Sequence, residues 1–496
     1  MKKLLLLSLL AIFAMASCRQ KESVASGGIQ LGFSSDTVYL DTVITTVGSS
    51  TYTLKVRNPS SDIVEIDNIS LGRGTSSKYR INVNGNSGNQ HQKVEILPKD
   101  SIYIFIDVKA SVIGSSQSHL YVDSLIFRNK GVEQNVKLVT LAQDVYFHFP
   151  THFIVVSGTI IPYSIITNTT HTLPNDKPHV FYGYGVVDEG GELNINGGTD
   201  LYFHQNSGLW VFEGATLKVA EGATGGIGDS VTFTGDRLEP FYENAPGQWG
   251  GALGGIFIQG GSTDNVINNA VIKNATTALR VDSSSVPNLT ITNSHILNSS
   301  RTGIYGGFGN MEAYNTVVAN AGLQLFYAFG GNYQFRHCTF ANYWNQSTRS
   351  TAAVTISNYL DVNDTAGNPL RLVRNLESCY FGNCIITGNN SIEFAVLDDE
   401  AGSLNYQMTN ALLKTSTDPD EIDYDLSDQS IFTDIRINSQ ADFVNYTNNI
   451  YALDSNSQAV DQGNVIDGSM TNGVDILGNF RSFNGTPDLG AHERQY

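Results

Sequence analysis

The feature that most constrains the fold is a repeat with a period of about 22 residues in the second half of the chain. Each repeat can be written around one asparagine or its substitute, and the first three gaps between these anchors are 24, 22 and 22 residues. The gap of 46 residues before Asn383 contains an insertion around Tyr359 to Arg374. A fixed period of this length is typical of a solenoid, whose coils place equivalent residues above one another, about 4.8 Å apart. The anchors are Asn269, Asn293, Asn315, His337, Asn383 and Asn410.

Two columns of the repeat are apolar in every copy. A β-sandwich has no reason to repeat its inward positions at this period, so both columns predict the core of a solenoid. Two residues before the anchor stand Ile267, Ile291, Ala313, Phe335, Phe381 and Met408. Three residues after it stand Ile272, Ile296, Val318, Phe340, Ile386 and Leu413.

Asparagine suits the anchor position for a physical reason. It tolerates the left-handed backbone of tight turns, and stacked amides can hydrogen-bond along the solenoid axis. The column of Asn269, Asn293, Asn315, Asn383 and Asn410 resembles the asparagine ladder of the pectate-lyase-like superfamily. This resemblance covers roughly Leu193 to Tyr446 and implies a right-handed parallel β-helix, whereas it specifies function only weakly.

The preceding residues, from 29 to 147, alternate between apolar and polar side chains in short segments such as Tyr52 to Val56, Ser101 to Val108 and Asn135 to Leu141. About seven such strands separated by turns predict a β-sandwich. The segment Leu97 to Ile102 resembles immunoglobulin-like modules of bacterial surface proteins, which implies a spacer or a packing partner. The whole chain is therefore predicted to be all-β.

The last fifty or so residues resemble the choice-of-anchor module that follows many bacterial β-helices. The resemblance rests on Ala459 to Gly463, Asp475, Gly478 and Pro487 to Glu493. We expect a buried charge network in which Arg481 lies among carboxylates and which closes the open end of the solenoid, because a bare last coil would expose core and strand edge. The network residues are Asp461, Arg481, Asp488 and Glu493.

The chain begins with Lys2 and Lys3, an apolar run from Leu4 to Met15, and small residues before Cys18, the layout of a secretory signal. The segment around Cys18 resembles a bacterial lipobox, which implies cleavage before Cys18 and its acylation. We therefore expect an outer-membrane lipoprotein, at the cell surface or facing the periplasm, held to the membrane by its lipid. The expected organisation is a signal peptide (1–17), a tether (18–28), a sandwich (29–147), a β-helix (148–445) and a cap (446–496).

The formal charge of −18 argues against nucleic acid and against attraction to anionic polymers. Cys338, Cys379 and Cys384 are too sparse for a disulfide framework. We interpret Cys338 and Cys384 as buried free thiols on neighbouring coils, with a disulfide between them as the alternative.

Exported β-helices include polysaccharide lyases and glycoside hydrolases, so their catalytic groups must be sought. Asp398, Asp399 and Glu400 form the only compact acidic group of the repeats, and we interpret it as a solvated turn. The basic residues fall in no shared column, and His295 and His337 stand in different ones. No metal site or cofactor is therefore expected, and calcium has no supporting motif.

A candidate glycan-binding surface comes from the third strand of each coil. If Leu279, Ile304 and Leu325 face inward, the residues that follow them face outward on successive coils. An arginine beside two aromatic rings suits stacking against sugars. The alternative is that the insertion or the N-terminal domain covers this stripe. Its residues are Arg280, Tyr305 and Phe326.

A second outward column, two residues after each anchor, is too apolar for bare solvent, and it includes Val317, Ile385 and Leu412. We expect another part of the chain to pack there. The function predicted from all these features is a noncatalytic cell-envelope lipoprotein with a rigid surface for glycan binding or a structural role. A polysaccharide lyase or glycoside hydrolase is the alternative, and an adhesin for a protein partner is the third.

Overall fold

A computed structural model describes residues 23–45, 47–110, 119–156, 158–223, 229–283, 288–364, 366–465, 467, 473–481 and 485–495. The chain divides into two compact units, Met1–Asp144 and Val145–Tyr496. The predicted boundary at 147/148 therefore falls slightly late. The signal segment and Cys18 lie outside the described residues. Among the residues that are described, no helix has the length and apolar character needed to cross a membrane.

The first unit consists of two five-stranded sheets around one core. Neighbouring strands are antiparallel except β2 and β10, which are parallel. The short 3-10 helix η1 (Gly74–Ser76) follows β4. The first sheet has the order β1 (Gly32–Phe33), β3 (Tyr52–Arg57), β8 (Ser101–Val108), β5 (Tyr79–Val83) and β6 (Asn86–Gly88). The second has the order β2 (Thr37–Ile44), β10 (Val132–Gln143), β9 (His119–Asn129), β4 (Val64–Leu71) and β7 (Gln90–Ile96).

Alternation of side chains explains these strands. In β8, Ile104 and Ile106 are completely buried, whereas Tyr103 and Phe105, which alternate with them, are exposed. A two-residue period of this kind places one face of each sheet on the shared core. The strand β7 was not predicted because its sequence, from Gln90 to Ile96, is polar and it lies at a sheet edge.

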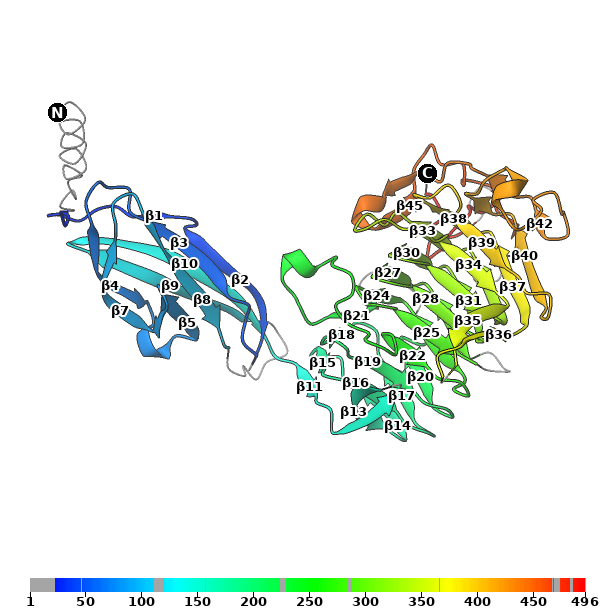
Figure 1. Cartoon of the computed structure of the whole chain (residues 1–496), viewed down its shortest axis with the longest axis horizontal. Coiled ribbons are helices and arrows are strands. Elements are labelled where there is room, and N and C mark those ends of the chain that lie inside the picture. Colours follow the sequence, from blue (N-terminus) through cyan, green and yellow to red (C-terminus); the bar gives the residue numbers. More distant parts are fainter. Residues whose placement is uncertain are drawn as a thin grey trace, which may run out of the picture. The chain divides into compact units, whose positions relative to one another are not determined.

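The second unit contains three large sheets, which Figure 1 shows as stacked strands running from β14 to β42. Sheet I has the order β11 (Tyr146–His148), β15 (His179–Phe181), β18 (Asp200–Phe203), β21 (Val231–Gly235), β24 (Ala270–Lys273), β27 (His295–Ser299), β30 (Val317–Ala321), β33 (Thr339–Asn342), β38 (Ile385–Gly388), β41 (Leu412–Leu413) and β43 (Arg436–Ile437).

Sheet II has the order β12 (His152–Val156), β13 (Thr159–Thr167), β16 (Tyr184–Val187), β19 (Gly208–Val211), β22 (Ile256–Ile258), β25 (Leu279–Asp282), β28 (Ile304–Gly307), β31 (Phe326–Phe329), β34 (Val354–Ser357) and β39 (Phe394–Leu397). Sheet III has the order β14 (Thr170–Leu173), β17 (Glu192–Ile195), β20 (Thr216–Val219), β23 (Asn265–Asn268), β26 (Leu289–Thr292), β29 (Asn310–Tyr314), β32 (Gly331–Arg336), β37 (Leu376–Gly382), β40 (Leu404–Thr409) and β42 (Phe432–Thr433).

From β15 to β40 the chain visits sheets I, II and III in turn, apart from the separate strands β35 and β36. We call each such set of three strands a coil. All neighbours are parallel except β12 and β13. The unit is thus all-β with large parallel sheets, an arrangement that fits a β-helix-like fold. Coils begin at β15, before Leu193, where the repeat pattern becomes visible in the sequence.

The two predicted core columns are confirmed. Ile267, Ile291, Ala313, Phe335, Phe381 and Met408 are paired strand to strand in sheet III and are completely buried. The second column is likewise paired strand to strand in sheet I, and its side chains are at most 1% exposed. It consists of Ile272, Ile296, Val318, Phe340, Ile386 and Leu413. The sequence period therefore reports the register of these two sheets.

All six anchors have left-handed backbone, with φ between 47° and 53°, at the turn from sheet III to sheet I. The predicted amide ladder is only partly formed. The Asn315 Nδ2 donates to Asn293 Oδ1 at 3.1 Å, and Asn383 Nδ2 lies 2.8 Å from His337 Nε2. Anchor amides also bind the C-terminal segment (residues 439–495), as in Asn383 Nδ2 to the Asn464 carbonyl at 2.8 Å.

The C-terminal segment covers the outer face of sheet I, as the apolar outward column predicted. Val317, Ile385 and Leu412 are completely buried in a cluster with residues of this segment, among them Tyr451 and Leu489. The expectation that these residues close the end of the solenoid is wrong. They lie along the side of several coils because that face is too apolar to remain exposed.

Residues 416–431 pack against the last coils instead. Tyr424 contacts the ring of Phe394 at 5.4 Å between centroids and that of Phe432 at 5.6 Å. This stretch contains the 3-10 helix η4 (Pro419–Glu421). Beyond it, β44 (Phe443–Asn445) and β45 (Ile450–Leu453) form an antiparallel hairpin around η5 (Tyr446–Asn448). The predicted boundary at 445/446 is therefore wrong, since it divides this hairpin.

Two other loops leave the coils. The insertion forms an antiparallel hairpin of β35 (Tyr359–Asn363) and β36 (Pro369–Val373) between sheets II and III. The loop before β22 contains η3 (Pro240–Tyr242) and returns to the core at Trp249. Trp249 is completely buried, stacks on Phe203 at 4.4 Å and donates its Nε1–H to the Lys273 carbonyl.

Candidate functional site

A row of large side chains runs along the outer face of sheet II. Strand pairing places Arg280 beside Tyr305 on the next coil, and Tyr305 beside Tyr327 on the one after. In the other direction the row continues to Phe257 and Trp210. Parallel pairing thus brings residues from five coils into one outward column.

The position predicted for Phe326 in this row is wrong. Phe326 is completely buried, and it pairs with Ile304 in the inward column. Tyr327 occupies the outward place instead. Leu325, the predicted inward residue, is also buried, but it lies in the turn that precedes the strand. Two consecutive buried residues at this corner hide the true register from the sequence.

The outward rings and the arginine contact one another. The Arg280 Cζ lies 4.5 Å from the Phe257 ring centroid and 5.9 Å from that of Tyr305. The Tyr305 and Tyr327 rings stack with centroids 5.7 Å apart and an interplanar angle of 14°. Arg280 also forms a bidentate ion pair with Asp282, at 3.0 and 2.8 Å. These contacts hold the side chains as a rigid platform.

Only one end of the row is open to solvent. Trp210 and Phe257 are buried beneath Leu253 and Ile161, whereas Arg280, with 34% of its side chain exposed, is accessible. We call the part-exposed set Arg280, Tyr305 and Tyr327 the sheet II platform. Partial burial raises the pKa of the Tyr305 phenol. It also raises the pKa of the Tyr327 phenol to about 12, so both phenols stay protonated at neutral pH.

The inserted hairpin borders the platform without covering it fully. Tyr359 and Asp361 lie close enough to Tyr327 to contribute to its raised pKa, after burial and Tyr305. Within the hairpin, Arg371 lies 3.9 Å above the Tyr359 ring and pairs with Asp361 at 2.7 Å. The hairpin therefore supplies an aromatic and charged edge to the platform.

The acidic group at the end of β39 is held by neighbouring side chains. Asp398 Oδ1 accepts from the Asn358 amide at 2.6 Å, and Asp399 Oδ2 pairs with Arg371 at 3.3 Å. The Asp399 backbone N–H also donates to Asn358 Oδ1 at 2.7 Å. These contacts fix the turn, in which Asp398 and Glu400 are exposed.

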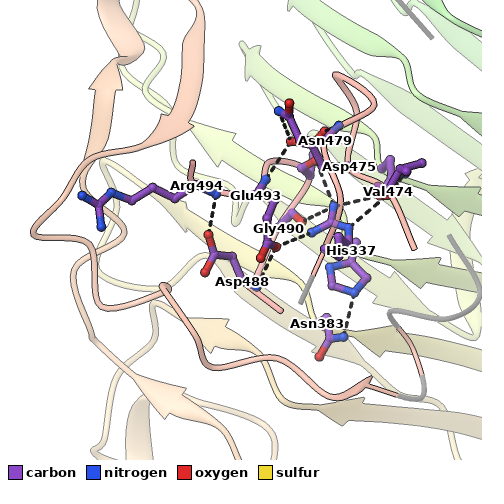
Figure 2. Close-up of polar contacts among 12 residues, drawn as sticks. His337, Asn383, Val474, Asp475, Asn479, Asp488, Gly490, Glu493 and Arg494 are labelled. Carbon is purple, nitrogen blue, oxygen red and sulfur yellow. Dashed lines mark hydrogen bonds and ion pairs between the residues drawn. The ribbon is translucent and has the colours of Figure 1, made fainter. Parts of the chain in front are cut away.

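Arg481, Asp488 and Glu493 of the predicted charge network lie together in the C-terminal segment, and Figure 2 shows Asp475, Asp488 and Glu493 beside His337 and Asn383 of the coil corner. The Arg481 Nη1 lies 3.5 Å from Glu493 Oε2, and Nη2 donates to Asn315 Oδ1 at 2.8 Å. Burial lowers the pKa of Arg481 to about 10. The network thus joins the segment to the anchor turn.

Backbone groups complete this network. The Asp488 carboxylate accepts from the N–H groups of Asp461 and Arg494, each at 2.7 Å. Glu493 Oε2 accepts from the Asp488 N–H at 2.9 Å, and the Glu493 N–H donates to Asp475 at 2.9 Å. Burial raises the pKa of Asp488. Because the carboxylates bind backbone N–H groups, we interpret these contacts as stabilising the fold of the C-terminal segment.

The thiols of Cys338, Cys379 and Cys384 are free and buried. Burial raises the pKa of Cys379 and of Cys384, which keeps these sulfurs protonated. In the part of the chain that the structure describes, no group of three or more histidine, cysteine, aspartate or glutamate side chains has the geometry to hold a metal ion.

Sequence reasoning missed one buried ion pair. Arg349, in the loop after β33, pairs with Glu393 at 2.6 and 2.8 Å, and both side chains are at most 2% exposed. Glu393 also accepts from the Ala353 N–H at 2.9 Å. The two residues are 44 positions apart, and no local pattern links them. The pair fixes the long loop onto the next coil.

No family model matches the chain, and no curated protein matches it either. Among solved structures, it is similar to the catalytic unit of a GH87 α-1,3-glucanase from Streptomyces thermodiastaticus strain HF3-3, with 9% identity, a TM-score of 0.26, and coverage of 77% of this chain and 87% of that one. A family 123 glycoside hydrolase from Clostridium perfringens has 10% identity and a TM-score of 0.18, over 24% of this chain and 31% of that one.

The periplasmic chaperone SfaE has 12% identity and a TM-score of 0.17, over 27% of this chain and 82% of that one. Of the family 123 enzyme described above, this chain spans about a third of the length. At TM-scores of 0.26 and below, these similarities support no conclusion about activity.

Proposed function

We propose that this protein is a noncatalytic cell-envelope lipoprotein that binds glycans on the outer face of a right-handed parallel β-helix. The observation that carries the proposal is the sheet II platform. Its Tyr305 and Tyr327 rings are stacked, part-exposed and held in place by strand pairing, and Arg280 lies beside them. Flat aromatic faces with a polar group alongside suit the apolar faces and hydroxyls of sugar rings.

The platform favours binding over catalysis because its ionisable groups are engaged. Asp282 is paired with Arg280, and Asp361 is paired with Arg371. A general acid or base needs a pKa near the working pH, whereas the phenol of Tyr327 has its pKa raised to about 12. A polysaccharide lyase or glycoside hydrolase remains the competing proposal, and it requires product formation.

Glycan retention tests this proposal. The purified protein is applied to plant, algal and host polysaccharides with and without calcium, and both retention and new reducing or unsaturated ends are measured. Tyr305→Ala with Tyr327→Ala should weaken retention, whereas the matched variant Tyr305→Phe with Tyr327→Phe, which keeps both ring faces, should preserve it. Release of products would replace the binding proposal with an enzymatic one, and unchanged retention in the alanine variant would refute the platform.

The lipid anchor and the localisation are part of the same proposal. Cys18 would carry the acyl chains, residues 18–28 would form the tether, and the first unit would act as an immunoglobulin-like spacer. Metabolic labelling with a fatty-acid analogue should label the parent protein and place it in the outer-membrane fraction. Cys18→Ser should lose the label. Labelling that persists in Cys18→Ser would refute the anchor without affecting the platform.

A further inference from the structure

Four asparagine amides from separate parts of the second unit form a closed ring. Asn298 Nδ2 donates to Asn244 Oδ1 at 3.3 Å, and Asn320 Nδ2 donates to Asn298 Oδ1 at 3.4 Å. Asn320 Nδ2 also donates to Asn449 Oδ1 at 2.8 Å, and Asn449 Nδ2 donates to Asn244 Oδ1 at 3.5 Å. We call these four residues the amide ring. It joins two coils, the loop before β22 and the turn that follows η5.

Backbone conformation explains only part of this arrangement. Asn298, Asn320 and Asn449 have φ of 55°, 57° and 59°, a left-handed region in which asparagine is favoured. Asn244 does not have a positive φ and is exposed in its loop, so the turn geometry does not require an asparagine there. Backbone geometry therefore does not explain why the Asn244 amide meets the other three.

The amide ring lines a pocket of about 130 Å³ whose wall is aromatic. Tyr343 and Tyr446 stack there with ring centroids 4.2 Å apart, and Trp344 lies beside them. Tyr446 is 42% exposed, so its ring is accessible. The same two tyrosines also line a second pocket of about 600 Å³, a volume within the roughly 300–1,000 Å³ typical of ligand sites. The stacked pair therefore borders both pockets.

The chemistry of the first pocket is polar without formal charge. Its lining contains asparagine, glutamine, threonine, tyrosine, tryptophan and proline side chains only. Amides offer both donors and acceptors, which matches hydroxyl groups, and aromatic faces match the C–H faces of pyranose rings. The second pocket adds the Lys414 ammonium, which donates to the Gly388 carbonyl at 2.6 Å, and the exposed Asp442.

We propose that these two pockets together form one groove, which is a second glycan site specific for an uncharged oligosaccharide. One sugar unit binds in the pocket of the amide ring, the next stacks on Tyr446, and the chain continues into the larger pocket. The choice of ligand class rests on the proposed glycan-binding function. The site itself is separate from the sheet II platform, because its residues lie at the turn from sheet I to sheet II and in the C-terminal segment.

The test is calorimetric binding of neutral gluco-, manno- and galacto-oligosaccharides to the whole purified protein, with oligogalacturonate as the anionic comparison. Asn244→Ala should weaken binding about fivefold, as expected for one lost hydrogen bond. Tyr446→Ala should weaken it roughly tenfold through lost stacking, whereas Tyr446→Phe, which keeps the ring, should bind like the parent. Ligand should also change the tryptophan fluorescence of the parent, and Trp344→Phe should remove most of that change.

The outcomes separate this site from the platform. Weaker binding by Asn244→Ala and by Tyr446→Ala supports the groove, whatever the platform variants do. Unchanged binding in both, with loss in the Tyr305 and Tyr327 alanine variant, would overturn the groove and leave the proposed function standing. Tighter binding of oligogalacturonate than of any neutral sugar would overturn the uncharged specificity. No binding of any glycan would overturn both proposals.

Discussion

Replacing Phe326 with alanine should destabilise the second unit by about 3–5 kcal/mol. Phe326 has no exposed surface, and its ring meets those of Tyr333 and Phe335 edge-on, with centroids 5.1 and 4.7 Å apart. Removing the ring costs about 2 kcal/mol of transfer free energy. Each of the two edge-on contacts adds about 0.5–1.5 kcal/mol, which brings the total to the stated range.

Urea unfolding followed by tryptophan fluorescence measures this loss. The three tryptophans, Trp210, Trp249 and Trp344, all belong to the second unit, so their signal reports that unit alone. Tyr327→Ala is the matched control, because its part-exposed ring should cost only about 1 kcal/mol. The loss of unfolding free energy in each variant is calculated from the shift in its urea midpoint, provided that the slope against urea concentration is unchanged. A larger loss for Tyr327→Ala than for Phe326→Ala would refute the register, since it would mean that Tyr327 faces the core.

Two further predictions concern buried charges and pH. Glu393→Gln should cost about 3–5 kcal/mol by leaving the buried Arg349 guanidinium without its anion, whereas Arg371→Gln, at an exposed pair, should cost less than about 1 kcal/mol in the same urea assay. Similar losses in the two variants would contradict this. Burial lowers the pKa of His492 to about 3 and that of His295 to about 4, so both rings are neutral in the folded protein. Because an unfolded histidine titrates near 6.5, the stability that depends on the neutral rings is present above about pH 6.5 and is lost as the pH falls toward 4. Urea midpoints measured across that range should fall less steeply for His492→Gln than for the parent, and equal slopes would contradict the assignment.

The sequence predicted sheets I and III well because each anchor fixes its neighbours. Ile291 and Ile296 lie two residues before and three residues after Asn293, and no variable turn intervenes. Sheet II lies beyond a turn of variable length, so the register is not carried across it. Leu325 and Phe326 are both buried there, and only the strand pairing of Phe326 with Ile304 distinguishes them.

Contacts between residues far apart in the chain were the other feature that the sequence could not predict. The apolar character of Val317 and Ile385 showed that a cover was needed, but nothing in the pattern said which segment supplies it. Arg280 and Tyr305 were placed in the outward column correctly, because their coils carry no extra turn residue. The amide ring was not predicted, since Asn244 and Asn449 meet across 205 residues of sequence.

The cover over sheet I has a consequence for how the protein is made. Arg481 reaches Asn315 across 166 residues, so the C-terminal segment docks on coils that were synthesised much earlier. Contacts between such distant residues form late, because the loop-closure entropy must be overcome first. Until then the growing chain carries a bare apolar strip. A product that stops a few dozen residues early would keep that strip permanently, which makes it a substrate for chaperones and proteases although nearly all of its coils are intact.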